Sequence, residues 1–347
     1  MNNTSSVIRF CISALCVLLI LTYTSIKGLF YTDNGAVSAQ TASVAPPEQT
    51  QSEQTDTQNE NPNTDQNASP AESAESVAES ATGVVKGAVI ERFISPYTAN
   101  TSYNGVYLKN NTELNINLQD FVDGKLGFNI EKNGEPQVLI LHTHATESYL
   151  LHNESYYTDS DSARTTNNEY NMIALGKIIA DRLNSAGIAT IHDTTQHDYP
   201  SYSESYSRAA KTKCSYTQKY PSIKIVIDLH RDAISANDTD KVKVTTEING
   251  KKAAQIMLVM GSQSGSVTNF PNWRENLKLA TKLQQKIETM YPSLARSIHF
   301  MSKNYNESLT TGSMLIEIGT DANSLDEAKY SAELVCNSLV ALLGDLK

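Results

Sequence analysis

The hydrophobic pattern of the chain changes at residue 137, where short apolar runs begin to alternate with helically spaced stretches. The predicted strands are the apolar runs 138–141, 188–192, 223–230, 253–261, 297–301 and 313–319. The predicted helices have apolar residues at helical spacing and cover 172–186, 205–220, 274–291 and 323–343. Strands that alternate with helices indicate an α/β fold with a mostly parallel, twisted sheet flanked by helices.

Residues 86–136 have a weaker pattern, with short β-like runs broken by Asn and Gly. The two main runs are "GVYLKNNTELNINL" and "KLGFNIEKNGEP". We interpret 86–136 as a β-rich lead-in to the same domain. The sequence therefore predicts one folded domain over 86–347.

The N-terminus has an uninterrupted apolar pattern, with no charged residue from 10 to 26. A helix of that length spans roughly 26 Å, close to the ~30 Å hydrocarbon core of a bilayer. We predict an N-terminal transmembrane anchor within 1–30 and an extracytoplasmic domain. A cleaved signal peptide with a small-residue site at 37–39 is the alternative, and the length of the apolar run favours the anchor.

Residues 31–85 are rich in Gln, Asn, Ser, Thr, Ala and Pro and lack a hydrophobic pattern. Nine acidic residues and no Lys or Arg lie between Asp33 and Glu79, so this stretch holds nearly all of the chain's net charge of −10. Such a composition predicts a disordered acidic linker with a root-mean-square span of roughly 40 Å. The domain itself is near neutral without a basic stripe, which argues against nucleic acid as a partner.

Polar residues follow the predicted strands at their carboxyl ends. His142 follows 138–141, His230 ends 223–230, and Glu317 lies near the end of 313–319. The carboxyl ends of strands in an α/β sheet meet at one crevice, so these side chains can converge. Two histidines and a carboxylate are a common ligand set for catalytic zinc, and a nearby Glu can take a proton from an activated water.

Several motifs, in order along the chain, resemble the stage II sporulation protein P family of cell-wall hydrolases. They are "HTHATESY", "HDTTQHDYPSYSESYSRA", "YPSIKIVIDLHRDAI", "INGKKAAQIMLVMG" and "NWRENLKLA". The resemblance covers roughly 100 to 340, and the predicted anchor and linker also fit the layout of the family.

The resemblance implies a zinc-dependent N-acetylmuramoyl-L-alanine amidase with an amidase-like catalytic domain. Such a peptidoglycan hydrolase cuts the amide between N-acetylmuramic acid and L-alanine, and this family is also credited with cutting stem-peptide cross-links. The implied role is remodelling of the septal cell wall for engulfment of the forespore during sporulation. The implied partners are the membrane, peptidoglycan, and the stage II sporulation proteins D and M.

The resemblance also implies roles for individual residues. His142 and His230 match the zinc histidines, and Glu317 matches the glutamate that acts as general base in related amidases. His144 has the same strand parity as His142 and is the alternative ligand, with His142 favoured.

The third zinc ligand has two candidates, Glu147 and Glu169, and the family's own motif favours Glu147. Arg231 and Arg164 are candidates for binding a substrate carboxylate, Arg164 through a bidentate pair.

Two other functions remain open at this stage. A zinc carboxypeptidase or endopeptidase acting on stem peptides would need an Arg for a free terminal carboxylate, and Arg231 could serve. The second alternative function is that of a scaffold that binds the cell wall and has no enzymatic activity.

Overall fold

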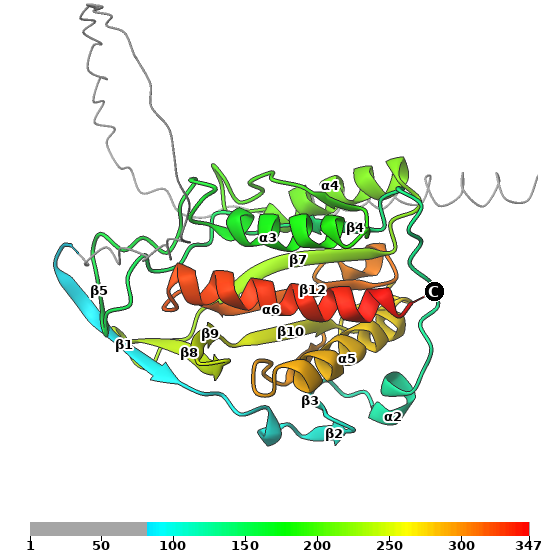
Figure 1. Cartoon of the computed structure of the whole chain (residues 1–347), viewed down its shortest axis with the longest axis horizontal. Helices are drawn as coiled ribbons and strands as arrows, with labels where there is room; N and C mark the ends of the chain where they lie inside the picture. Colours follow the sequence, from blue (N-terminus) through cyan, green and yellow to red (C-terminus); the bar gives the residue numbers. More distant parts are fainter. Residues whose placement is uncertain (1–81, 347) are drawn as a thin grey trace, which may run out of the picture. The chain divides into compact units, whose positions relative to one another are not determined.

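The computed structural model describes residues 82–346 (Figure 1). The predicted membrane anchor and nearly all of the predicted linker lie outside the described residues. Within 82–346, no helix is both long enough and apolar enough to cross a membrane.

The main sheet has eight strands in the order β2-β3-β11-β10-β12-β7-β4-β6. Their bounds are β2 Thr101–Tyr103, β3 Val106–Asn111, β4 Val138–Leu141, β6 Thr190–His192, β7 Ile225–Asp232, β10 Ile256–Gly261, β11 Ile298–Met301 and β12 Ser313–Thr320. Neighbouring strands are parallel except at β10–β12 and β2–β3. The predicted α/β fold class with a mostly parallel sheet is therefore confirmed.

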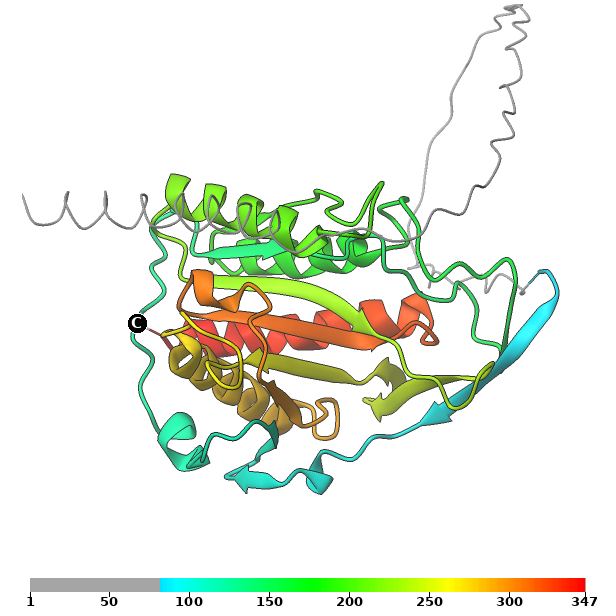
Figure 2. The ribbon, with the colours of Figure 1, turned by 180° about the vertical axis from the view of Figure 1, so that it is seen from behind.

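Helices cover both faces of this sheet. The longer ones are α3 Met172–Ser185, α4 Ser205–Lys219, α5 Trp273–Met290 and α6 Leu325–Gly344, and the shorter ones are α2 Leu118–Val122, η2 Pro96–Thr98 and η3 Glu307–Leu309. Helices α3, α5 and α6 lie together on one face (Figure 1), and α4 lies on the other (Figure 2). All four long helices begin and end within two residues of the predicted bounds.

A second, smaller sheet has the order β5-β1-β8-β9. Its strands are β1 Val85–Arg92, β5 Tyr156–Thr158, β8 Lys241–Ile248 and β9 Lys251–Ala254. The predicted strand 253–261 is wrong in one respect, because Gln255 divides it between β9 and β10. The buried Gln255 side chain bonds to the Ile94 backbone and the Ser293 carbonyl, which fixes the break between the two sheets.

Strand β4 shows how the two faces of the sheet are built. Val138 and Ile140 belong to the large core under α3, α5 and α6. Leu139 and Leu141 belong to a smaller core that includes Ala209 of α4. Successive side chains of a strand point to opposite faces. Both faces are covered here, which explains why β4 is an unbroken apolar run.

Candidate active site

His230 of β7 and Glu317 of β12 lie directly opposite each other on adjacent parallel strands. Val226, four residues before His230, packs in the small core with α4, so by strand alternation His230 faces α4 rather than α3. The predicted convergence of strand ends is present for this pair.

His142 lies on the other face and does not join His230. Its Nδ1 is 3.2 Å from the Leu229 carbonyl oxygen and its Nε2 is 2.9 Å from His192 Nε2. Burial, together with the neighbouring His192, lowers the pKa of His142 to about 3. The structure therefore does not bring His142, the ligand favoured from the sequence, to His230.

The different positions of His142 and His144 arise where β4 ends. His142 continues the alternation of Val138 and Ile140 and points under α3, where its ring contacts the position of Gly176. The next four residues, 143–146, form a turn instead of more strand. His144 therefore does not share the face of His142, although the two are separated by the spacing of a strand.

His144 is the histidine that lies beside His230. The two rings are perpendicular with centroids 5.3 Å apart. Tyr202 stacks on the His144 ring at 4.6 Å, and Tyr206 meets it edge-on. The His144 nitrogens are 3.2 Å from the Tyr202 hydroxyl and 3.3 Å from Ser205 Oγ.

Glu147 joins the same cluster from the turn after β4. Its Oε2 lies 3.5 Å from His230 Nδ1 and accepts a hydrogen bond from the Arg231 backbone N–H. Its Oε1 lies 3.5 Å from the Arg164 guanidinium. The other candidate, Glu169, is exposed to solvent. The structure thus brings Glu147, and not Glu169, to His230.

Asp228 supports His230 from within β7. Its Oδ1 lies 3.0 Å from His230 Nε2, although this contact is not aligned as a hydrogen bond, and Thr143 donates to both carboxylate oxygens. Burial would lower the pKa of His230, but the Asp228 and Glu147 carboxylates raise it well above its usual value. His230 is therefore a cation held between two carboxylates.

Glu317 contributes the fourth side chain of the cluster, from the position opposite His230. Its Oε2 is buried and has no hydrogen-bond partner among the described residues. Burial raises the pKa of Glu317 to about 8, although the adjacent His230 lowers it. A carboxyl group that can gain or lose a proton near neutral pH is suited to general acid–base chemistry.

The two predicted substrate-binding arginines have different surroundings. Arg164 is partly exposed, donates to Asp198 Oδ2 at 2.6 Å and lies over the Tyr202 ring. Arg231 is buried, and its guanidinium donates to the carbonyl oxygens of Ser148, Ala163 and Asp232.

The substrate-binding prediction for Arg231 therefore does not match its geometry. The Arg231 guanidinium donates to backbone carbonyl oxygens, and these hydrogen bonds hold the loop after Glu147 in place. Arg164 retains an exposed edge beside Glu147.

The side chains of this cluster can be compared with the ligand set that a metal ion requires. Among residues 82–346, no three His, Cys, Asp or Glu side chains are arranged as a complete metal site. The donor set of His144, Glu147 and His230 nevertheless matches that of catalytic zinc. The 3.5 Å from His230 Nδ1 to Glu147 Oε2 is close to the separation of roughly 3.4 Å expected for two atoms that share a tetrahedral zinc.

The sequence patterns do not single out Asp198 or Asp228, which contact the cluster. Asp228 has a detectable signal, because it is a carboxylate inside the apolar run "IKIVIDLH". A buried carboxylate needs a partner, and His230 two residues on faces the same side of the strand. Asp198 reaches the site through a long loop and has no comparable signal.

Comparisons with known proteins give one family. The family model described as Stage II sporulation protein P (SpoIIP) matches residues 22–339. The Stage II sporulation protein P of Bacillus subtilis (strain 168) is 31% identical over 208 residues, which cover 56% of this chain and 48% of that protein. The chain thus aligns with about half the length of this curated relative.

Three solved structures of amidases have low similarity to this chain. An N-acetylmuramyl-L-alanine amidase of Mycobacterium abscessus is 13% identical and covers 60% of this chain and 99% of its own, with a TM-score of 0.36. The catalytic domain of CwlV from Bacillus (Paenibacillus) polymyxa var. colistinus is 8% identical and covers 61% and 99%, with a TM-score of 0.35. The Clostridium difficile 630 amidase is 13% identical and covers 62% and 100%, with a TM-score of 0.34. These scores are too low to support conclusions about this chain.

Proposed function

Because the chain belongs to the stage II sporulation protein P family, we propose that it is a zinc-dependent N-acetylmuramoyl-L-alanine amidase that hydrolyses peptidoglycan during sporulation. The observation that carries this proposal is the cluster of His144, Glu147, His230 and Glu317 at one edge of the sheet. These residues combine a zinc donor set with a carboxyl group whose pKa is raised to about 8.

In this proposal His144, Glu147 and His230 hold the metal. His230 Nδ1 and Glu147 Oε2 already lie at a suitable spacing, and His144 must leave its contacts with Tyr202 and Ser205. Zinc bound there would polarise the amide carbonyl and lower the pKa of a water molecule. Asp228 would orient the His230 ring, as carboxylates commonly do for ligating histidines.

Glu317 serves as the proton carrier of the reaction. Its carboxylate accepts a proton from the water that attacks the carbonyl carbon of the N-acetylmuramoyl-L-alanine amide. The C–N bond then breaks, and the same carboxyl group delivers the proton to the departing L-alanine nitrogen. Arg164, whose guanidinium is partly exposed beside Glu147, binds a carboxylate or carbonyl of the stem peptide.

The carboxypeptidase alternative is weakened by Arg231. It requires a free guanidinium for a terminal carboxylate, and that of Arg231 is buried and bonded to three backbone carbonyls. An additional endopeptidase activity does not need this arginine and remains part of the proposal.

The setting of the enzyme is proposed from the sequence and the family. The N-terminal segment 1–30 would anchor the protein, and the acidic linker would hold an extracytoplasmic domain at the cell wall. Stage II sporulation proteins D and M are the proposed partners during engulfment.

Mass spectrometry of fragments released from purified peptidoglycan tests the function. The zinc-loaded protein should release stem peptides with a free L-alanine amino terminus, and a chelator should abolish the release. Fragments cut only within the stem would indicate a peptidase. Zinc binding and wall binding without any cleavage would indicate a scaffold.

A further inference from the structure

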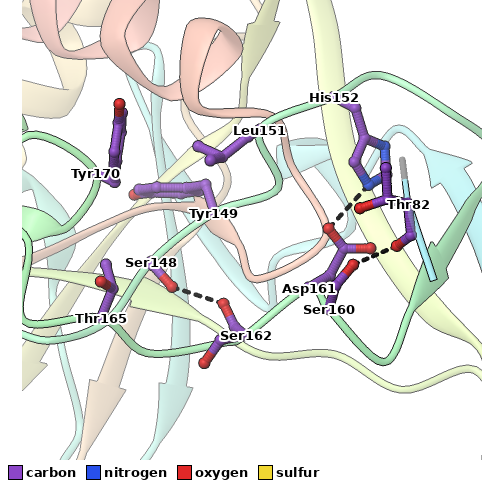
Figure 3. Close-up of a pocket in the computed structure, with 10 residues that line it drawn as sticks. All are labelled: Thr82, Ser148, Tyr149, Leu151, His152, Ser160, Asp161, Ser162, Thr165 and Tyr170. Carbon is purple, nitrogen blue, oxygen red and sulfur yellow. Dashed lines mark hydrogen bonds and ion pairs between the residues drawn. The ribbon is translucent and has the colours of Figure 1, made fainter. Parts of the chain in front are cut away.

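A cavity of about 330 Å³ (Figure 3) is lined in part by Ser148, the residue after Glu147 of the candidate active site. Its walls come mainly from the segment 148–170, which follows Glu147 directly along the chain. None of the functions assigned above uses this cavity.

The cavity is physically tied to Glu147. Ser148, which lines it, donates its backbone N–H to the Ala163 carbonyl, and Arg231 donates to the carbonyls of both residues. The Arg231 backbone N–H also donates to Glu147 Oε2. The buried Arg231 therefore fixes the position of Glu147 relative to the cavity wall.

The three serine hydroxyl groups of the cavity offer acceptors rather than donors. Ser148 donates its hydroxyl proton to the Ser162 carbonyl, Ser162 donates to the Arg164 carbonyl, and Ser160 donates to the Thr82 carbonyl (Figure 3). Because these hydroxyl protons are already donated within the protein, the serine oxygens can only accept hydrogen bonds from a ligand.

Asp161 places a carboxylate in the cavity. Its Oδ1 lies 3.0 Å from His152 Nε2, and His152 Nδ1 accepts the Glu154 backbone N–H. Burial would raise the pKa of Asp161, but hydrogen bonds from Thr158 and His152 lower it, so the carboxylate is ionised at neutral pH. Among the described residues that line the cavity, none is Lys or Arg.

We propose that this cavity binds a primary ammonium group on the stem peptide, namely the side-chain amine of its diamino acid. The Asp161 carboxylate and the serine oxygens would receive the ammonium hydrogens. The exposed Leu151 and Tyr170 at the cavity would contact the aliphatic part of the same side chain. This inference rests on the proposed function, because it names the part of the peptidoglycan substrate that the cavity recognises.

Ser148, which follows Glu147 directly in the chain, lines the cavity. In the substrate, the diamino acid is two residues beyond the L-alanine at the scissile amide. The cavity is therefore next to a candidate metal ligand in the enzyme, and the amine is close to the reacting bond in the substrate.

The test compares two soluble glycan–peptide fragments that differ only in whether the diamino acid side-chain amine is free or N-acetylated. For the zinc-loaded wild type we expect a KM about tenfold lower for the free amine, the usual scale for a hydrogen bond to a charged group. Ser162→Lys places a competing cation at an exposed position of the cavity and should remove this preference. Ser185→Lys, an exposed site at the end of α3, adds the same charge elsewhere and should retain it. Equal KM values for both fragments with wild type would overturn the proposal.

A second variant and a binding measurement separate this inference from the proposed function. Asp161→Asn should reduce the preference for the free amine with little change in kcat. If the wild type cleaves neither fragment, the proposed function fails and the cavity is tested by calorimetric binding of the two peptides without glycan. Preferential binding of the free amine that Ser162→Lys abolishes would still support the cavity, and equal binding would refute it.

Discussion

His230 and Glu317 are partners in register on β7 and β12, but substitutions at the two positions should have different effects. His230→Ala removes a metal ligand, so we expect loss of zinc and of activity together. Glu317→Gln keeps the shape of the side chain but cannot accept a proton. It should retain near-stoichiometric zinc and lose roughly 10²–10⁴ in kcat.

Elemental analysis beside turnover on peptidoglycan distinguishes these outcomes. A Glu317→Gln protein that loses its zinc would make Glu317 a ligand. Full activity of the same variant would leave the raised pKa of Glu317 without a catalytic role. Glu147→Gln should behave like His230→Ala, whereas Glu169→Gln should behave like wild type.

The choice between His144 and His142 gives a second prediction at this scale. His144→Ala should reduce zinc content and activity, because its ring lies beside His230. His142→Gln should retain zinc but lower the free energy of unfolding, because His142 is buried between His192 and the Leu229 carbonyl. Zinc lost from His142→Gln and kept by His144→Ala would restore the assignment made from the sequence.

The raised pKa of His230 predicts how zinc affinity depends on pH. Asp228 and Glu147 favour the protonated ring in the metal-free protein, and a histidine must be neutral to bind zinc. Zinc binding should therefore release a proton, and the apparent affinity should rise with pH until the pH exceeds the raised pKa. Calorimetry in buffers of different ionisation enthalpy measures the released protons, and a pH-independent affinity would contradict the prediction.

Part of this site is predictable from the sequence, and part is not. The strand-end rule identifies His230 and Glu317 because parallel strands end at a common edge. It does not decide between His142 and His144, because β4 is buried on both faces and its apolar run carries no alternation. The position of Arg231 beside His230 predicts that its side chain binds substrate. The sequence does not reveal that three backbone carbonyl oxygens surround the guanidinium.

At the scale of elements, local signals predict the helices better than the second sheet. Helix α6 begins with Ser324, whose side chain accepts the Glu327 backbone N–H in a capping box. Such a signal lies within four residues of sequence. Strand β1 pairs instead with β8, more than 140 residues away, and no local pattern specifies that pairing.

Substitutions in the capping box of α6 should lower the free energy of unfolding without changing turnover. Ser324→Ala should lower the free energy of unfolding by about 1 kcal/mol. Glu327→Ala should cost more, about 3 kcal/mol, because it also removes the nearer carboxylate of the buried Lys243 ammonium, which then keeps only Asn153 and the more distant Glu91. Urea denaturation measures both, and turnover at low temperature should stay near wild type. Equal costs for the two variants would mean that the ion pair adds nothing beyond the cap.

At the scale of the whole molecule, the predicted linker would connect the proposed membrane anchor to the domain. Nearly all of it lies outside the described residues, so the prediction rests on its composition. Deletion of half of 31–85 should leave turnover on isolated peptidoglycan unchanged, because no site residue comes from this segment. Activity on the wall of the cell should fall, since the span of a coil decreases with the square root of its length. Loss of activity on isolated peptidoglycan would reveal a role in catalysis.

The position of β1 has a mechanical consequence for the proposed tethering of the domain between membrane and wall. Tension from the residues before Val85 enters the domain along β1, which pairs with β5 on one side and with β8 on the other. The ladder hydrogen bonds lie across the strand, so a pull along its axis loads several of them at once and cannot open them singly. Force transmitted through the N-terminal segment is therefore resisted in shear by the small sheet before it reaches β7 and β12, and the candidate active site can keep its geometry while the wall and the membrane move apart.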